Sequence, residues 1–312
     1  MKNRIFSLCL VLCLCLSLCS CRGEQTYRYT VTGTFDTIIE ILSSSAEATE
    51  HYGKTAEKQL KIWHELCDAY HPYADVVGIY AINQSGGKWV TVSDELLGLL
   101  TFGQQAYAKT EGAVNMMCGA VSRLWKDTET PPTEAEIRAA LSHTDIGCLE
   151  IDGNRVRLTD PDAYLDMGAF AKGYALERVA RQLEADGFGG LISAVSSVIA
   201  VGDKNGQPFA VGIGDQQGGV GAVLQLKNMA LSTSGTDQRY FIYEEKTYHH
   251  ILDLTTGFPA ESGVTQASVL HENAAWADVY STAALIRGRA EGDAILRRNG
   301  TYEYYGKIKE WL

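Results

Sequence analysis

The sequence predicts an α+β fold in a single domain of mixed sheets with packed helices, and three observations support this. Apolar residues recur at helical spacing in several stretches of the first half, whereas the second half contains successive short β-branched runs. Strands in runs, with helices inserted between them, are typical of α+β folds. No repeat, low-complexity tract or clear linker divides the sequence, so its roughly 290 folded residues form one domain.

The first residues predict export and a lipid anchor. A basic start is followed by an apolar run from Ile5 to Cys19, which is too short to span a membrane as a stable helix. The run closes on Leu18-Cys19-Ser20-Cys21, which resembles a bacterial lipoprotein signal with Cys21 as the lipidated residue. Cys19 is an alternative acceptor, and an ordinary cleaved signal is the other reading. We therefore expect a lipoprotein signal peptide at residues 1–20, a tether at 21–26 and a folded domain at 27–312.

Charge and cysteine content narrow the class of protein. Loss of residues 1–20 removes two basic residues and no acid, so the formal net charge falls from -11 to -13. Such an acidic protein is a poor candidate for binding nucleic acid, and charge would not draw it to anionic lipid. Three cysteines remain beyond the N-terminal segment, at Cys67, Cys118 and Cys148, so a disulfide framework is not expected, although one pair is possible.

The N-terminal part of the domain predicts a hairpin followed by a helix. Residues Tyr27–Leu42 are rich in Thr, Val, Ile and Tyr, and a break near Gly33 makes them a strand or hairpin. Residues Ser44–Cys67 have a helical pattern, and Tyr70–Asn83, which contains Pro72, is expected to be a loop.

Local signals define the next elements. Ser93 is expected to cap a helix that extends to Lys109. Thr133-Glu134-Ala135-Glu136 is a capping box that opens a short helix ending at Leu141. The turn residues Asp152-Gly153-Asn154, flanked by apolar alternation, predict a hairpin.

The stretch 165–180 is the centre of the predicted fold, because an apolar strand end runs there into a helix. Asp166 is expected to accept hydrogen bonds from N–H groups of the first helical turn. Lys172 lies near the helix start, where the dipole disfavours positive charge, so an anion is expected nearby. Gly168 and Gly173 leave room for a bulky group to approach the backbone. A solvated lysine on a capped surface helix is the alternative.

The second half is predicted to be mostly strand and to end in helices. The small hydroxyl-bearing stretch Ser232–Thr236 suits an anion-binding nest or an ordinary loop, and we expect the loop. Helical patterns occupy Ala274–Ile286 and Ala290–Arg298. Residues Gly190–Gly202 are small and β-branched, and the expected strands after them are Phe209–Ile213, Ala222–Leu226, Tyr240–Tyr243, Thr247–Leu252 and Ala267–Leu270.

Two motifs near the C-terminus carry groups capable of chemistry. Asp278 and Thr282 lie one helical turn apart, so they share a helix face. This pair of hard oxygen ligands suits Mg²⁺ or Ca²⁺, but a solvated helix face is the more common explanation. His249 and His250 would face opposite sides of a strand, which disfavours a shared zinc ion and leaves one histidine for proton transfer.

Together these short motifs occur in a specific order along the chain. In that order they resemble the ApbE family of FAD:protein FMN transferases, and the resemblance covers nearly the whole domain. The residues that carry it are Thr32-Gly33-Thr34, Asp166–Ala175, Ser232–Gly235, His250–Asp253 with Thr256-Gly257, and Ala277-Asp278 with Ser281-Thr282.

The resemblance implies that residues 27–312 are a flavin transferase catalytic domain that depends on Mg²⁺. Such an enzyme transfers FMN from FAD to a threonine or serine hydroxyl of an exported or membrane redox flavoprotein and releases AMP. His250 would be the catalytic proton acceptor, with Asp253 orienting it. The metal ligands would be Ala169 (backbone carbonyl), Asp278 and Thr282, and the FAD contacts Thr32, Tyr70, Ala113, Val114, Asn115, Asp166, Lys172, His250 and Ile251.

Three positions depart from the family pattern. Thr32 stands where methionine is usual, and Leu254-Thr255 replaces a Pro-Arg pair. Ser193-Ala194-Val195-Ser196 replaces an Asn-x-Gly-Gly turn, so side chains occupy the positions of two glycines.

The sequence is also compatible with other functions. Water as acceptor would make the protein an FAD pyrophosphatase that yields FMN and AMP. A lipoprotein that captures flavin for a transporter, or an inactive relative, would share the same signal and tether. In each case the expected location is the extracytoplasmic face of the cell membrane, through the lipid anchor.

Overall fold

The computed structural model describes residues 25–214, 219–299 and 304–308. The signal peptide, most of the tether and Cys21 were predicted for residues outside these ranges. Within them, Cys67, Cys118 and Cys148 are free thiols, so the single disulfide left open by the sequence is not formed. No helix in the described part of the chain is long and apolar enough to cross a membrane.

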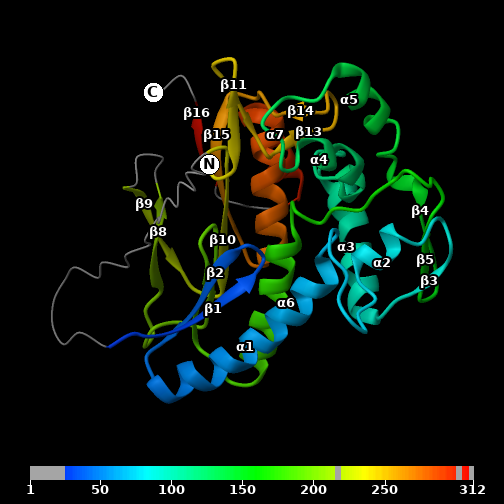
Figure 1. The fold of residues 1–312 in the computed structure, drawn as a ribbon. Coiled ribbons are helices and arrows are strands. Elements are labelled where there is room, and N and C mark those ends of the chain that lie inside the picture. Colours follow the sequence, from blue (N-terminus) through cyan, green and yellow to red (C-terminus); the bar gives the residue numbers. More distant parts are fainter. Residues whose placement is uncertain (1–24, 215–218, 300–303, 309–312) are drawn as a thin grey trace, which may run out of the picture.

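A seven-stranded antiparallel sheet forms the centre of the fold, in the order β1-β2-β6-β7-β10-β15-β16 (Figure 1). The N-terminal hairpin pairs at its edge, as the Thr- and Val-rich pattern predicts. The strands are β1 Tyr27–Thr34, β2 Thr37–Ser43, β6 Gly190–Ala194, β7 Ser197–Val201, β10 Met229–Gly235, β15 Val264–His271 and β16 Tyr304–Ile308.

Three helices cover one face of this sheet, and a hairpin covers the other (Figure 1). The helices are α1 Ala46–Cys67, α6 Ala171–Ala185 and α7 Ala274–Asn299, and the hairpin strands are β8 Phe209–Gly214 and β9 Val220–Leu226. Helix α7 kinks at Gly288, whose φ is 75°, so the two helices expected in this region are two segments around a glycine. The main core therefore lies between the sheet and α1, α6 and α7, because their apolar faces meet there.

A second group of elements packs beyond the helices. It contains α2 Ile79–Asn83, β3 Val90–Thr91, α3 Asp94–Lys109, η1 Met116–Cys118, α4 Gly119–Trp125, α5 Glu134–Leu141, η2 Ile146–Cys148, β4 Leu149–Asp152 and β5 Arg155–Leu158. Ser93 caps α3, and Thr133 forms a capping box with Glu136 at the start of α5, so both predicted caps are confirmed. The hairpin strands β11 Tyr240–Tyr243, β12 Lys246–His249, β13 Leu252–Asp253 and β14 Phe258–Pro259 adjoin this group.

Three local predictions were wrong. Ile79 and Ile82 are fully buried, and this burial stabilises α2 inside the predicted loop 70–83. Ser232–Gly235 forms the end of strand β10 in the sheet. The predicted strand Thr247–Leu252 is interrupted, since β12 ends at His249 and β13 begins at Leu252.

The lowered pKa of His271 predicts that the folded protein loses stability in acid. Burial, and secondarily the charge of Lys109, lower the pKa of His271 to about 4, and its Nδ1 accepts a hydrogen bond from the Asn273 N–H at 2.8 Å. Between pH 6.5 and 4 the unfolded chain therefore binds a proton that the folded chain excludes. The contribution of His271 is present in full above pH 6.5 and is lost as the pH falls through about 4.

The measurement is the midpoint of thermal unfolding at pH 7.5 and at pH 5. We expect His271→Gln to reduce the acid-induced fall in this midpoint relative to the parent protein. An equal fall in the two proteins would contradict the assignment to His271.

Candidate active site

Four elements meet around one buried carboxylate, that of Asp278 in the second turn of α7. Lys172 in the first turn of α6 places its Nζ 3.2 Å from Asp278 Oδ1 and 3.3 Å from Oδ2. Ser232 of β10 donates to Oδ1 at 2.6 Å. Ser197 of β7 lies 2.5 Å from Lys172 Nζ and 2.9 Å from the Ser232 hydroxyl. These four residues form one connected polar network, which we call the Lys172–Asp278 network.

The network is deep in the protein. Asp278 is 6% exposed, and Ser197 and Ser232 are each 1% exposed. A solvated helix face for Asp278 is therefore wrong. The anion expected near Lys172 is present as the Asp278 carboxylate, and ion pairing with hydrogen bonds is what makes a buried charge tolerable.

The close approach of α6 and α7 brings the pair together. Gly173 donates its N–H to Asp278 Oδ2 at 2.9 Å. The buried carboxylate of Glu177, one turn later in α6, accepts a hydrogen bond from the Ala274 N–H at the start of α7 at 2.8 Å. Glu177 of α6 thus accepts a hydrogen bond from a backbone N–H at the start of α7, and Gly173 of α6 donates one to the Asp278 carboxylate of α7.

Gly173 offers a direct test of this packing. A Cβ at this position would lie 2.5 Å from Asp278 Cβ and 2.6 Å from the Ala274 carbonyl oxygen. We expect Gly173→Ala to destabilise the protein by about 1–3 kcal/mol, because the helix backbones cannot both stay in place. The midpoint of urea denaturation measures this loss.

Gly98 in α3 provides the matched control. A Cβ there would meet the Tyr174 hydroxyl at 3.1 Å, at the end of a side chain that can turn away. Alanine also favours a helix over glycine by up to about 1 kcal/mol. Gly98→Ala should therefore leave the denaturation midpoint unchanged or raised. An equal effect of the two substitutions would show that the α6–α7 contact tolerates a side chain.

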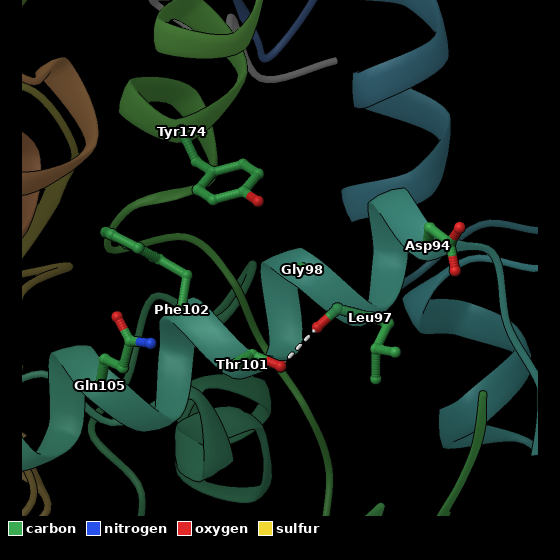
Figure 2. Close-up of a pocket in the computed structure, with 7 residues that line it drawn as sticks. All are labelled: Asp94, Leu97, Gly98, Thr101, Phe102, Gln105 and Tyr174. Carbon is green, nitrogen blue, oxygen red and sulfur yellow. Dashed lines mark hydrogen bonds between the residues drawn. The ribbon is translucent and has the colours of Figure 1, made fainter. Parts of the chain in front are cut away.

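Gly98 and Tyr174 line an open groove along α3, and Figure 2 shows the Tyr174 ring reaching over it from α6. The other lining residues are Asp94, Leu97, Thr101, Phe102 and Gln105. No predicted site residue lines this groove. The predicted site residues therefore lie outside this groove.

Hydroxyl groups surround the second predicted metal ligand, Thr282. Ser234 of β10 lies 3.0 Å from Thr282 Oγ1 and 2.9 Å from Ser281 Oγ. Because β10 carries both Ser232 and Ser234, it joins Asp278 and Thr282 through side chains on the same face of the strand. The polar sequence Ser-Thr-Ser is compatible with a buried strand because its hydroxyls find partners on α7 and β15.

Asp166 and Tyr70 form a second polar pair, just before α6. The Tyr70 hydroxyl donates to Asp166 Oδ2 at 2.6 Å, and Oδ1 accepts from the Gly168 N–H at 2.8 Å. The helix begins later, at Ala171, so Asp166 makes a local turn and not the predicted helix cap. Burial and the Asp166 carboxylate hold the pKa of Tyr70 well above its usual range. The phenol therefore stays protonated and able to donate.

A cation and a thiol adjoin this pair. Lys126 Nζ lies 4.1 Å from the centre of the Tyr70 ring. The Cys118 thiol points at the Asp166 carbonyl oxygen, 3.8 Å away, and burial followed by the Asp166 charge raises the pKa of Cys118 to about 12. Cys118 is thus a protonated structural thiol, not a nucleophile.

His250 follows the end of β12 and is held by the Arg239 carbonyl, which accepts from the His250 N–H at 3.1 Å and lies 3.2 Å from Nδ1. Although the residue is exposed, the surrounding chain crowds its ring, and this desolvation lowers the pKa of His250 to about 4. The Asp253 carboxylate accepts from the Thr255 N–H, so Arg239 takes the orienting role expected of Asp253.

His249 has the packing role left for one histidine of the pair. Its Nδ1 accepts from the Ile251 N–H at 3.3 Å, and its Nε2 lies 3.0 Å from the Ala260 carbonyl oxygen. The two contacts define a neutral ring that donates from Nε2, in agreement with a pKa lowered by burial.

The remaining predicted residues occupy varied environments. Ala113, Val114 and Ile251 are buried in the main core, and Ala169 lies just before α6. Asn115 caps η1 and donates to the Thr144 carbonyl, whereas Thr32 is exposed on β1. Of the predicted site residues, the structure brings Lys172 and Asp278 into contact, and hydroxyl groups of β10 link Asp278 to Thr282. It also pairs Tyr70 with Asp166. Sequence reasoning missed Ser197 and Glu177, whose small or charged side chains carry no local signal of burial.

Comparisons with known proteins identify the family of this chain. The sequence pattern of the ApbE family matches residues 32–305. The chain belongs to the ApbE family. An FAD:protein FMN transferase of Klebsiella pneumoniae is 31% identical over 70% of this chain and 70% of its own length. One from Salmonella typhimurium is 28% identical over 67% of this chain, which spans 64% of that relative.

Solved ApbE structures share the fold. An ApbE protein from Thermotoga maritima has a TM-score of 0.84 and 26% identity, covering 92% of this chain and 95% of its own. The apo form of a flavinyl transferase ApbE from Pseudomonas stutzeri has a TM-score of 0.79 and 25% identity, with 93% of both chains covered. The single α+β domain predicted from the sequence is therefore confirmed.

Proposed function

We propose that this protein is an FAD:protein FMN transferase that requires Mg²⁺. It transfers FMN from FAD to a threonine or serine hydroxyl of a partner flavoprotein and releases AMP. The bond from phosphorus to AMP breaks, the hydroxyl oxygen bonds to the FMN phosphorus, and the hydroxyl proton passes to a base. The observation that carries this proposal is the buried ion pair of Lys172 and Asp278, one helical turn from Thr282.

The donor atoms at this site fit a hard divalent cation. Asp278 and Thr282 offer a carboxylate and a hydroxyl, and we propose the Ala169 carbonyl, just before α6, as the third of the oxygen donors that Mg²⁺ prefers. When bound, Mg²⁺ would neutralise charge on the diphosphate during cleavage. The Lys172 ammonium already lies against the carboxylate, so the site is built to hold positive charge.

The protein as a whole is acidic, so an anionic substrate needs a local positive charge, and the Lys172 ammonium would supply it. The Lys172 side chain is 20% exposed, so it is not fully enclosed by the protein, and its ammonium is paired with Asp278. Ser197 and Asp278 fix its direction. A diphosphate bound here would gain a charge-assisted hydrogen bond from a preorganised donor.

His250 is the proposed general base. At neutral pH its lowered pKa keeps the imidazole unprotonated, which is the form that accepts the hydroxyl proton. The Arg239 carbonyl, 3.2 Å from Nδ1, favours a proton on that nitrogen and leaves Nε2 as the acceptor.

The N-terminal sequence supports a place for this reaction outside the cytoplasm. A lipid on Cys21 would hold the domain at the extracytoplasmic face of the cell membrane, with residues 21–26 as a tether. The acceptor class proposed for this place is an exported or membrane redox flavoprotein.

The test is incubation of the purified protein with FAD, Mg²⁺ and a candidate acceptor, followed by intact-mass measurement. Transfer predicts that the acceptor gains the mass of one FMN and that AMP is released in equal amount. Free FMN formed equally without an acceptor would indicate a pyrophosphatase. Intact FAD in every mixture would indicate a binding protein or an inactive relative, and either result would overturn the proposal.

A further inference from the structure

The turn between β6 and β7 has an unusual residue in a strained conformation. It consists of Val195 and Ser196, since Ala194 and Ser197 are already paired across the hairpin. Val195 has a φ of 42°, in the left-handed region that β-branched residues avoid. It is the one β-branched residue with a positive φ in the described ranges, where the other non-glycine examples are Phe, Asp, Asn or Glu.

Packing within the protein does not explain this valine. The residue is 50% exposed, so much of the burial that would offset a strained backbone is absent. Glycine would adopt the same φ without strain. A strained residue that keeps an exposed apolar side chain indicates a role outside the folding of the turn.

Hydrogen bonds connect the turn to the Lys172–Asp278 network and to the neighbouring residue of β10. Ser197, the first residue after it, hydrogen-bonds to Lys172 Nζ and to Ser232. The Ser196 carbonyl accepts from the Thr233 N–H at 2.7 Å. The pairing of β10 with β7 stops at Ser232, whereas β10 continues to Gly235. Val195 therefore stands at the rim of the site, just before β7 begins and beside the point where β10 continues without β7 as its partner.

From this placement we propose that Val195 is a specificity-determining contact for the nucleotide substrate. The inference rests on the proposed function and adds to it a residue that selects FAD. With the diphosphate at Lys172, a ring system of the dinucleotide reaches the rim and covers the valine side chain. Apolar contact with the ring then offsets the strain of the turn.

Two substitutions separate the side chain from the backbone. Val195→Ala removes the apolar atoms and keeps a Cβ, and Val195→Gly also relieves the backbone. Val223→Ala is the matched control, because Val223 is 59% exposed on β9, on the face of the sheet opposite α6 and α7. The FAD dissociation constant is measured by flavin fluorescence, together with kcat at saturating FAD and the midpoint of thermal unfolding.

We expect both Val195 variants to raise the FAD dissociation constant by about fivefold or more, as loss of part of a valine contact predicts. The kcat should stay near the parent value, and Val195→Gly should unfold at the parent temperature or above. A purely structural valine would change the unfolding temperature and not the FAD affinity. FAD affinities within twofold of the parent in both variants would overturn the inference, whereas absence of FAD binding by the parent would overturn the proposed function itself.

Discussion

Asp278→Asn is expected to reduce FMN transfer by more than about 100-fold at fixed Mg²⁺, since even residues that support a metal ligand change activity by 10- to 100-fold. The amide keeps the size of the side chain and its hydrogen bond from Gly173, but it loses the charge proposed to bind the cation. It also leaves Lys172 without its buried partner, so unfolding should become easier by about 1–3 kcal/mol. The measurements are the Mg²⁺ dependence of transfer and the midpoint of urea denaturation.

Asp203→Asn is the control for this substitution. Asp203 also binds a lysine, Lys227 Nζ at 2.7 Å, and accepts a glycine N–H, from Gly206 at 2.7 Å, but it does so near the surface. The same change of charge should leave transfer and its Mg²⁺ dependence at the parent level. Parent-level transfer by Asp278→Asn at every Mg²⁺ concentration would rule out Asp278 as a metal ligand.

His250→Ala is expected to slow FMN transfer by about 10²–10⁴-fold, the usual contribution of a general base. FAD affinity should change much less, because the proposed role of the imidazole is to accept the proton of the acceptor hydroxyl. The measurement is transfer at saturating FAD beside FAD binding by fluorescence. His51→Ala, which alters an exposed histidine on α1, should transfer at the parent rate.

The pH profile gives a second readout for the same residue. Because the pKa of His250 is lowered to about 4, transfer by the parent should keep its rate down to about pH 5 and fall below it. An unperturbed histidine would lose rate near pH 6.5. Parent-rate transfer by His250→Ala would remove His250 from the mechanism.

Local signals in the sequence were sufficient for most of the elements. The caps at Ser93 and Thr133 and the hairpin turn at Gly153 act through neighbours a few residues away, so each could be identified without knowledge of the fold. The spacing of Asp278 and Thr282 likewise fixed their common helix face. Motif order was enough to indicate the family, which the comparison confirmed.

The loop predicted at Ser232–Thr236 was wrong for a physical reason. Small hydroxyl residues favour turns when their own backbone is the nearest partner. In the fold, Ser232 and Ser234 reach α7 and Thr233 reaches Ser268, so the same hydroxyls are satisfied inside a central strand. No pattern within five residues contains that information.

What the sequence by itself determined was the set of reactive groups and the elements that carry them: an acid and an alcohol on one helix, a lysine at the start of another, and a histidine after a strand. Only the tertiary structure decided which of them meet. Lys172 and Asp278 lie 106 positions apart, and they pair because Gly173 lets α6 and α7 approach closely. Burial of that pair follows from the packing of helices on a sheet, and burial strengthens the electrostatic interaction between the two charges.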